Sequence, residues 1–138
     1  LLDPYICSYI LKHILTTEVI MPIDTKYLLL TRMDVAPDKE DVFNKVYDEE
    51  HVPELLKVPG ILSAVRFKRR PKVEIAINGQ LQVYEYKDEP SYAAIYEIDN
   101  PSVLMSDEWA RAVEIGRWPK EIRPFTENRR QVLYGPIE

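Results

Sequence analysis

The 138-residue sequence contains one cysteine, two histidines and only four glycines. Cys7 has no partner within the chain, so no intrachain disulfide forms and nothing calls for an oxidising compartment. A zinc site needs three or four Cys, His or carboxylate ligands at local spacing, and Cys7, His13 and His51 are far apart in the sequence. The glycines are too few and too scattered for a phosphate-binding loop. We expect a cytoplasmic protein with no metal site and no cofactor.

Long runs of one charge and long apolar runs are also missing. The net charge of −5 comes from 23 acidic and 18 basic residues, and the one basic run, residues 68–70, favours the solvated end of a strand, with an anion contact as the alternative. Residues 1–20 are apolar but carry interrupting charges, which favours an amphipathic helical extension over a membrane span or signal peptide. We expect one domain over residues 21–138, with no nucleic-acid partner and no membrane association.

The domain alternates between strand and helix patterns. Helical patterns follow two proline-containing breaks, at residues 36–38 and 100–101. The dipeptide Asn78-Gly79 lies between two short strand patterns and favours a tight hairpin, inserted between the second and third main strands. Apolar residues alternate with a period of two in four longer segments, residues 27–35, 61–68, 92–98 and 131–137. This order predicts an α+β fold, the ferredoxin-like βαββαβ pattern with an antiparallel sheet and an extra hairpin.

Four strands covered by helices on one face leave the other face of the sheet bare. The predicted strands carry apolar residues on both faces, as in residues 27–35. An apolar bare face is normally buried by a partner, and in a symmetric pair the same surface serves both copies. The sequence therefore predicts a homodimer.

A helix break falls beside the one side chain of the domain that titrates near neutrality. Pro53 lacks an amide hydrogen and disfavours helix in the preceding residue, so the helix should end or kink next to His51. His51 is a candidate general acid or base, or it caps the broken helix by binding a freed carbonyl. Glu50 could orient the imidazole or lie in solvent. Arg66 could bind a substrate carboxylate or enolate, or pair with Glu97.

Aromatic residues are numerous enough to line a pocket for a flat, apolar ligand, although core packing also explains most of them. The candidate pocket residues are Tyr47, Trp109, Trp118, Phe125 and Tyr134.

The segment around the helix break carries a family resemblance. Residues 47–61, YDEEHVPELLKVPGI, resemble the dimeric α/β-barrel superfamily and especially its EthD-like members, with an "EH-x-P" step and then "PG" before the second strand. The stretch from Trp118 to Thr126, Asn128-Arg129 and Tyr134 are similar to the end of such domains. The resemblance covers about residues 26–137. It implies two subunits that join their sheets into a barrel, each with a cleft between sheet and helices.

Activities within this superfamily are diverse, and the fold alone does not choose among them. Members include cofactor-free monooxygenases, polyketide cyclases, lactone isomerases, lyases and haem enzymes. His51 matches the motif position of this family, which favours its place in a pocket. The leading interpretation is a cofactor-independent enzyme in which His51 moves a proton on a small aromatic or polyketide-like substrate. The alternatives are a non-catalytic dimer for metabolite binding or assembly, and a haem protein with His51 as axial ligand.

Overall fold

The protein was analysed as a computed structural model, which describes residue 23 and residues 25–138. The predicted helical extension over residues 1–20 lies outside the described residues. Within the described part of the chain, no helix has the length and hydropathy needed to cross a membrane.

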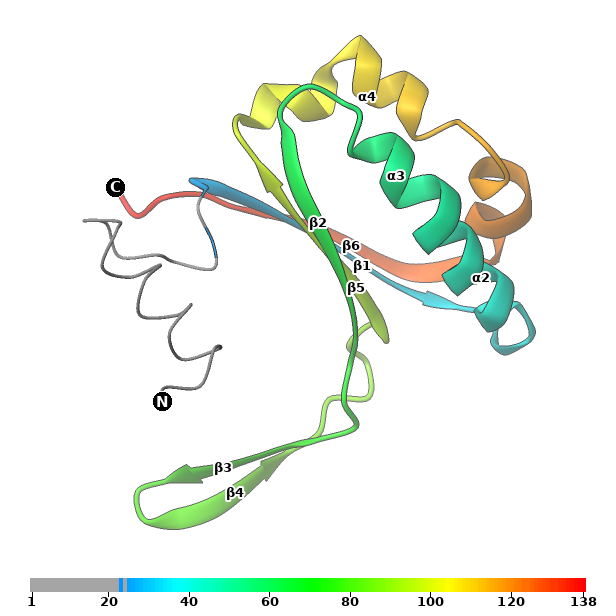
Figure 1. Ribbon diagram of the computed structural model, residues 1–138. Coiled ribbons are helices and arrows are strands. Elements are labelled where there is room, and N and C mark those ends of the chain that lie inside the picture. The colour runs from blue at the N-terminus through cyan, green and yellow to red at the C-terminus, as the bar shows by residue number, and fades with distance from the viewer. Residues whose placement is uncertain (1–22, 24) are drawn as a thin grey trace, which may run out of the picture.

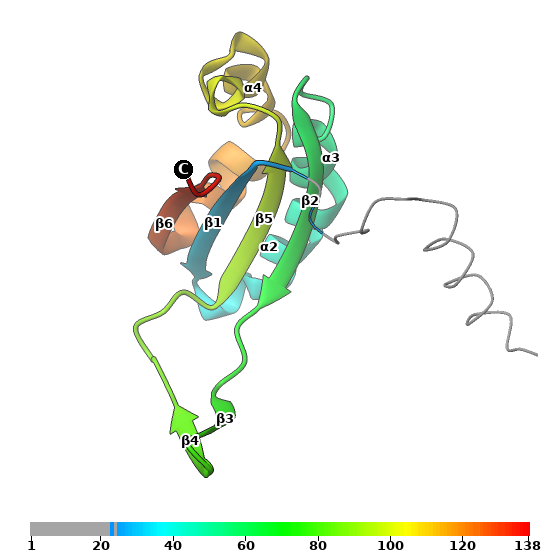
Figure 2. The ribbon, with the colours of Figure 1, turned by 90° about the vertical axis from the view of Figure 1, so that its left-hand side faces the viewer.

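The body is a four-stranded antiparallel sheet with helices packed on one face (Figure 1). Its strands occur in the order β2 (Ile61–Lys68), β5 (Tyr92–Ile98), β1 (Tyr27–Val35) and β6 (Thr126–Tyr134). The covering helices are α2 (Glu40–Val46), α3 (Val52–Leu55) and α4 (Asp107–Ala112). In Figure 2 the strands of the body lie in front of the helices, with their other face toward the viewer. The predicted α+β, ferredoxin-like fold is confirmed.

Short helical turns of other types extend these helices. Turns of 3₁₀-helix occur at Pro37–Lys39, Pro101–Met105 and Arg123–Phe125, and π-helical turns at Tyr47–His51 and Trp118–Ile122. Asn100 and Ser106 cap their helices, each accepting a hydrogen bond from a backbone amide two or three residues ahead.

Pro53 does not end its helix. The chain instead widens into the π-helical turn Tyr47–His51 just before the proline and then continues as α3. A π turn relaxes the hydrogen-bonding ladder at the point where a proline amide cannot donate. The prediction of a kink beside His51 is therefore correct in position, and the kink takes the form of a wider turn.

The end of the chain differs from the prediction. The last strand begins at Thr126 rather than at Gln131, and residues 118–125 form two helical turns that the sequence did not predict. The period-two pattern of β6 is masked because polar residues fill its first half and because a bulge interrupts its pairing with β1 between Arg32 and Asp34.

The core lies between the sheet and the helices. Alternate residues of β1 and β5 face inward, so that Leu29, Met33 and Tyr96 are buried against Phe43 and Val46 of α2. Burial of side chains this large is the main stabilising contribution of a domain of this size.

One glycine fixes the entry to β2. Gly60 has a φ of 95°, and a Cβ at this position would lie 2.3 Å from Cγ2 of Val103. The "PG" step before the second strand is thus required both by backbone conformation and by close packing.

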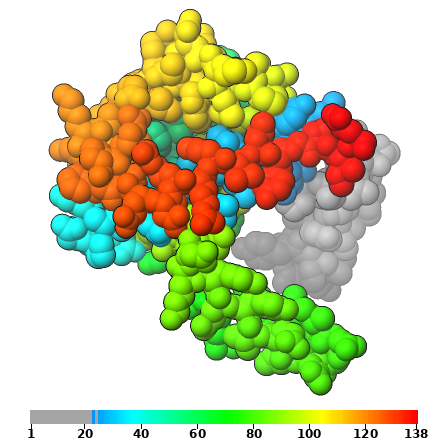
Figure 3. All heavy atoms as spheres, turned by 180° about the vertical axis from the view of Figure 1, so that it is seen from behind, coloured from blue at the N-terminus to red at the C-terminus, as the bar shows by residue number. Residues whose placement is uncertain are grey.

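The predicted hairpin stands apart from the body (Figure 3). β3 (Val73–Ile77) and β4 (Gln80–Tyr84) pair only with each other, joined by Asn78 and Gly79, whose φ angles are both positive. Nine of the ten strand residues are exposed. Figures 1 and 2 show the hairpin leaning toward the side of the sheet that faces away from the helices.

Candidate functional site

A cleft of about 210 Å³ lies between the sheet and the helical layer. Strands β1, β5 and β6 form its floor, and the π-helical turns with α3 and α4 form its walls. Its lining residues are Thr31, Met33, Tyr47, His51, Leu55, Tyr96, Trp109, Val113, Trp118, Arg123, Arg129 and Gln131.

His51 is enclosed by aromatic rings in this cleft. Its side chain is 6% exposed. The imidazole stacks on Trp118, with ring centroids 4.2 Å apart and an angle of 15° between the planes. The ring of Tyr47 meets the imidazole edge-on at 5.1 Å. Nδ1 of His51 is buried and has no hydrogen-bond partner among the described residues. A buried polar atom without a partner is unusual and points to a functional site.

The surroundings of His51 keep its imidazole neutral at physiological pH. Burial, together with the positive charges of Arg123 and Arg66, lowers the pKa of His51 to about 4, while Glu114 acts in the opposite direction. A neutral imidazole carries one nitrogen that accepts a proton and one that donates.

A pair of phenols lies in the same cleft. The hydroxyl oxygens of Tyr47 and Tyr96 are 3.3 Å apart. Burial raises the pKa of both phenols, so both stay protonated. One proton serves the bond between the two oxygens, which leaves the other hydroxyl hydrogen available to a ligand.

Glu50 binds Arg117 in the wall of the cleft. Among the described residues, it makes no hydrogen bond to the His51 imidazole. Its carboxylate accepts from the backbone amide of Arg117 at 3.1 Å and from Nε of Arg117 at 2.6 Å. The guanidinium of Arg117 lowers the pKa of the Glu50 carboxyl. This contact ties the turn that carries His51 to the turn that begins at Trp118.

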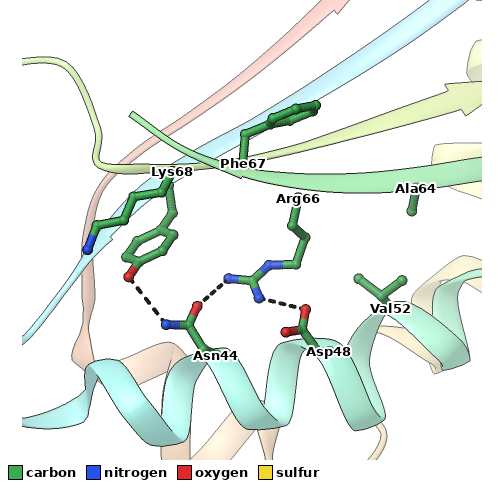
Figure 4. Close-up of a pocket in the computed structure, with 8 residues that line it drawn as sticks. Asn44, Asp48, Val52, Ala64, Arg66, Phe67 and Lys68 are labelled. Atoms are coloured by element: carbon green, nitrogen blue, oxygen red, sulfur yellow. Dashed lines mark hydrogen bonds and ion pairs between the residues drawn. The ribbon is translucent and has the colours of Figure 1, made fainter. Parts of the chain in front are cut away.

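Arg66 does not line this cleft; it reaches from β2 toward Asn44 and Asp48 of the helical layer (Figure 4). Its Nη1 donates to Asp48 at 2.7 Å and its Nη2 to Asn44 at 2.8 Å. The guanidinium lies 4.3 Å from the centre of the Tyr47 ring, which is a cation–π contact. Glu97 lies on the opposite face of the sheet by strand alternation, so Arg66 uses Asp48 as its acidic partner.

The structure brings together three of the five aromatic pocket residues. Tyr47, Trp109 and Trp118 line the cleft. Phe125 is 40% exposed under the ammonium of Lys39, and Tyr134 is 57% exposed on the bare face of the sheet. Both lie away from the cleft, because a helical turn at Arg123–Phe125 and the strand alternation of β6 direct them elsewhere.

Four polar residues of the cleft escaped the sequence analysis: Thr31, Arg123, Arg129 and Gln131. Arg123 and Arg129 fall in the segment whose helical turns and early strand start were not predicted. Thr31 and Gln131 lie on predicted strands, where no pattern marked them as site residues. Recognition that the last strand begins at Thr126 would have placed Arg129 and Gln131 on the same face.

The cleft is small for haem. Its volume of about 210 Å³ leaves little room for a macrocycle beside the imidazole. In the described part of the chain, no group of three or more His, Cys, Asp or Glu side chains is placed to hold a metal ion.

Comparisons with known proteins support the fold. No family model matches the sequence, and no curated protein matches it significantly. Among solved structures, the chain is similar to an ethyl tert-butyl ether D (EthD) family protein from Bacillus halodurans, with a TM-score of 0.50 and 12% identity. The match covers 80% of this chain and 99% of that one. The chain therefore has an EthD-like α+β fold.

Proposed function

We propose that the protein is a cofactor-independent enzyme that moves a proton on a small aromatic or polyketide-like ligand bound in the cleft. The main support for this proposal is that His51 is buried among aromatic rings and that its Nδ1 has no hydrogen-bond partner among the described residues. An imidazole held neutral in a water-poor cleft can accept a proton from an acidic C–H or O–H group and return it elsewhere, as cyclisation, isomerisation or elimination requires.

The other cleft residues have supporting roles in this proposal. Stacking on Trp118 holds the imidazole plane. The one hydroxyl hydrogen that the Tyr47–Tyr96 pair leaves free is donated to the oxygen that becomes negative when a neighbouring proton leaves. Arg66 and Glu50 act as positioning residues, the first through the Tyr47 ring and the second through Arg117.

A non-catalytic ligand-binding protein is the second candidate, and one observation favours it. The pKa of His51, about 4, makes the imidazole a weak base in the free protein. A weak base in an aromatic cleft serves as well for a hydrogen bond to a ligand as for proton transfer.

Solvent deuterium exchange separates these two candidates. A thermal-shift screen with aromatic acids, phenols and enolisable aromatic ketones identifies ligands of the wild type, and His51→Gln preserves the shape of the site. We expect the variant to bind the same ligands but to exchange their acidic C–H protons at least 100-fold more slowly, as measured by NMR. Equal exchange in the two proteins would favour the binding protein.

We further propose that the bare face of the sheet pairs with a second copy of the chain. In the observed register, Leu30, Val65, Ile95 and Val132 form one apolar row across all four strands. Val65 is 50% exposed. The hairpin extends toward the same side of the sheet (Figure 1), so a partner on this face would also contact its apolar residues.

Introducing a charge into this row is expected to prevent dimerisation without unfolding the domain. Val65→Glu places a carboxylate on the proposed interface, at a site already half exposed to solvent in the single chain. Light scattering after size exclusion should report a dimer for the wild type and a monomer for the variant. Leu56→Glu, at a residue 42% exposed in the helical layer, is the matched control and should remain dimeric. A monomeric wild type would contradict the proposal.

A further inference from the structure

The charge of the cleft is opposite to that of the whole protein. The chain has a net charge of −5, yet the residues that line the cleft include two arginines and no aspartate or glutamate. Positive groups gathered in a concave site raise the local concentration of anions.

The two arginines of the cleft differ in their hydrogen bonding. Arg123 donates to Oε2 of Glu114 at 3.0 Å and to the carbonyl oxygen of Val113 at 2.8 Å, so its charge is already balanced. The side chain of Arg129 makes no hydrogen bond or ion pair with any described residue. Its planar guanidinium is therefore free to bind a carboxylate through two parallel hydrogen bonds.

A strained backbone position directly precedes Arg129. Asn128 has a φ of 51°, uncommon for a residue other than glycine, and Asn128 and Arg129 together oppose the single residue Met33 of β1. This β-bulge is held by hydrogen bonds from Nδ2 of Asn128 to Asp34 at 3.0 Å and to the carbonyl oxygen of Asp88 at 2.9 Å. Bulges beside active sites redirect a side chain, and strain that the surroundings maintain accompanies function.

A second donor lies next to Arg129 along the same face of β6. Oε1 of Gln131 accepts from Oγ1 of Thr31 at 2.7 Å, and both residues line the cleft. This bond fixes the side-chain amide with Nε2 as its free donor. Arg129 and Gln131 together form a donor pair on the floor of the cleft, facing the wall that carries Trp118 and His51.

We propose that Arg129, supported by Gln131, binds the anionic group of the ligand, so that the cleft selects planar aromatic carboxylates over their neutral analogues. This inference rests on the proposed function, because it takes the aromatic cleft as the ligand site. The cleft of about 210 Å³ is at the small end for ligand sites, which favours compact ring systems. Such a ligand would place its ring against Trp118 and its carboxylate on Arg129.

Matched pairs of ligands test the inference directly. Benzoate and benzamide, cinnamate and cinnamamide, and 2-naphthoate and 2-naphthamide differ within each pair mainly in charge. Isothermal titration at pH 7 and low salt gives their affinities. We expect the wild type to bind at least one carboxylate about tenfold or more tightly than its amide, and Arg129→Gln to lose that preference while it keeps the affinity for the amide.

Arg130→Gln is the matched control, because it removes the same charge one residue further along the strand. Arg130 pairs with Glu89 at 2.9 Å and does not line the cleft. The Arg130→Gln variant should therefore retain the preference of the wild type for the carboxylate over the amide. The chain has only two tryptophans, Trp109 and Trp118, and both line the cleft, so a change in intrinsic fluorescence locates the bound benzoate there.

The possible outcomes separate the inference from the proposed function. Equal affinity for carboxylate and amide in the wild type, or a preference that survives in Arg129→Gln, would overturn the anion-binding role and leave the aromatic cleft as the ligand site. Failure of all three pairs to bind the wild type would overturn both. Loss of the preference in Arg130→Gln as well as in Arg129→Gln would reduce the effect to net charge and also overturn the role of Arg129.

Discussion

Trp118→Ala is expected to destabilise the domain by about 3–5 kcal/mol, the range for removing a buried tryptophan or phenylalanine side chain. Trp118 is 4% exposed. Its ring lies 4.2 Å from the centre of His51, 4.8 Å from that of Tyr47 and 6.0 Å from that of Phe43. Its loss therefore opens a cavity where α2, the cleft wall and the sheet meet. Urea unfolding at pH 7 measures the change.

The variant Trp118→Phe distinguishes two contributions to the loss of stability: the cavity and the missing aromatic ring. Phenylalanine retains a ring beside His51 and fills part of the volume, so this variant should lose clearly less stability than Trp118→Ala. Trp109→Ala gives a second comparison, because Trp109 is only half-buried. A cost below about 1 kcal/mol for Trp118→Ala would show that the surrounding helical turns collapse to fill the space, contrary to the expectation for a well-packed site.

The second large effect is a loss of stability in mild acid that depends on His51. The pKa of His51 in the folded protein, about 4, lies below its ordinary value of 6.5. Protons therefore bind the unfolded chain more tightly at this site. The stabilisation is fully present above pH 6.5 and disappears as the pH falls through 6.5 toward 4. Over that window it amounts to roughly 3 kcal/mol.

Comparison with His51→Gln isolates this contribution. The free energy of unfolding is measured in urea at pH 7 and pH 4.5 for both proteins, and the wild type should lose roughly 2–3 kcal/mol more than the variant. Carboxylates with lowered pKa values, such as Glu50 and Asp34, also lose stabilisation in acid, but they titrate in both proteins and cancel in the comparison. The same pH dependence in both proteins would mean that the imidazole is hydrated and titrates normally.

Much of the site can be anticipated from local sequence rules. Pro53 marks an irregular point in the helix, and His51 lies in the π-helical turn directly before it. Tyr47 lies one turn earlier and shares its inward stripe with Phe43. These relations depend on residues close together in the chain, where the helical repeat fixes which side chains share a face.

Contacts between distant residues could not be anticipated in the same way. Whether Arg66 pairs with Asp48 or with Glu97 depends on which face of β2 lies against α2, and the sequence offered both partners. The stacking of Trp118 on His51 joins positions 67 residues apart and requires the turn at Trp118–Ile122, which no local pattern predicted. Phe125 and Tyr134 illustrate the opposite error: both are close in sequence to residues of the cleft, but neither lines it.

By itself, the sequence determined the α+β class, the strand order along the chain, the hairpin turn at Asn78-Gly79 and the position of His51 at a helix break. Each follows from periodicity, proline and glycine within a few residues. Only the tertiary structure decided that aromatic rings enclose His51, that Arg66 binds Asp48 and Glu50 binds Arg117, and that a bulge precedes Arg129 at the cleft. The physical reason is that burial, electrostatic shifts and strand register arise from packing between segments remote in sequence, and no local interaction specifies them.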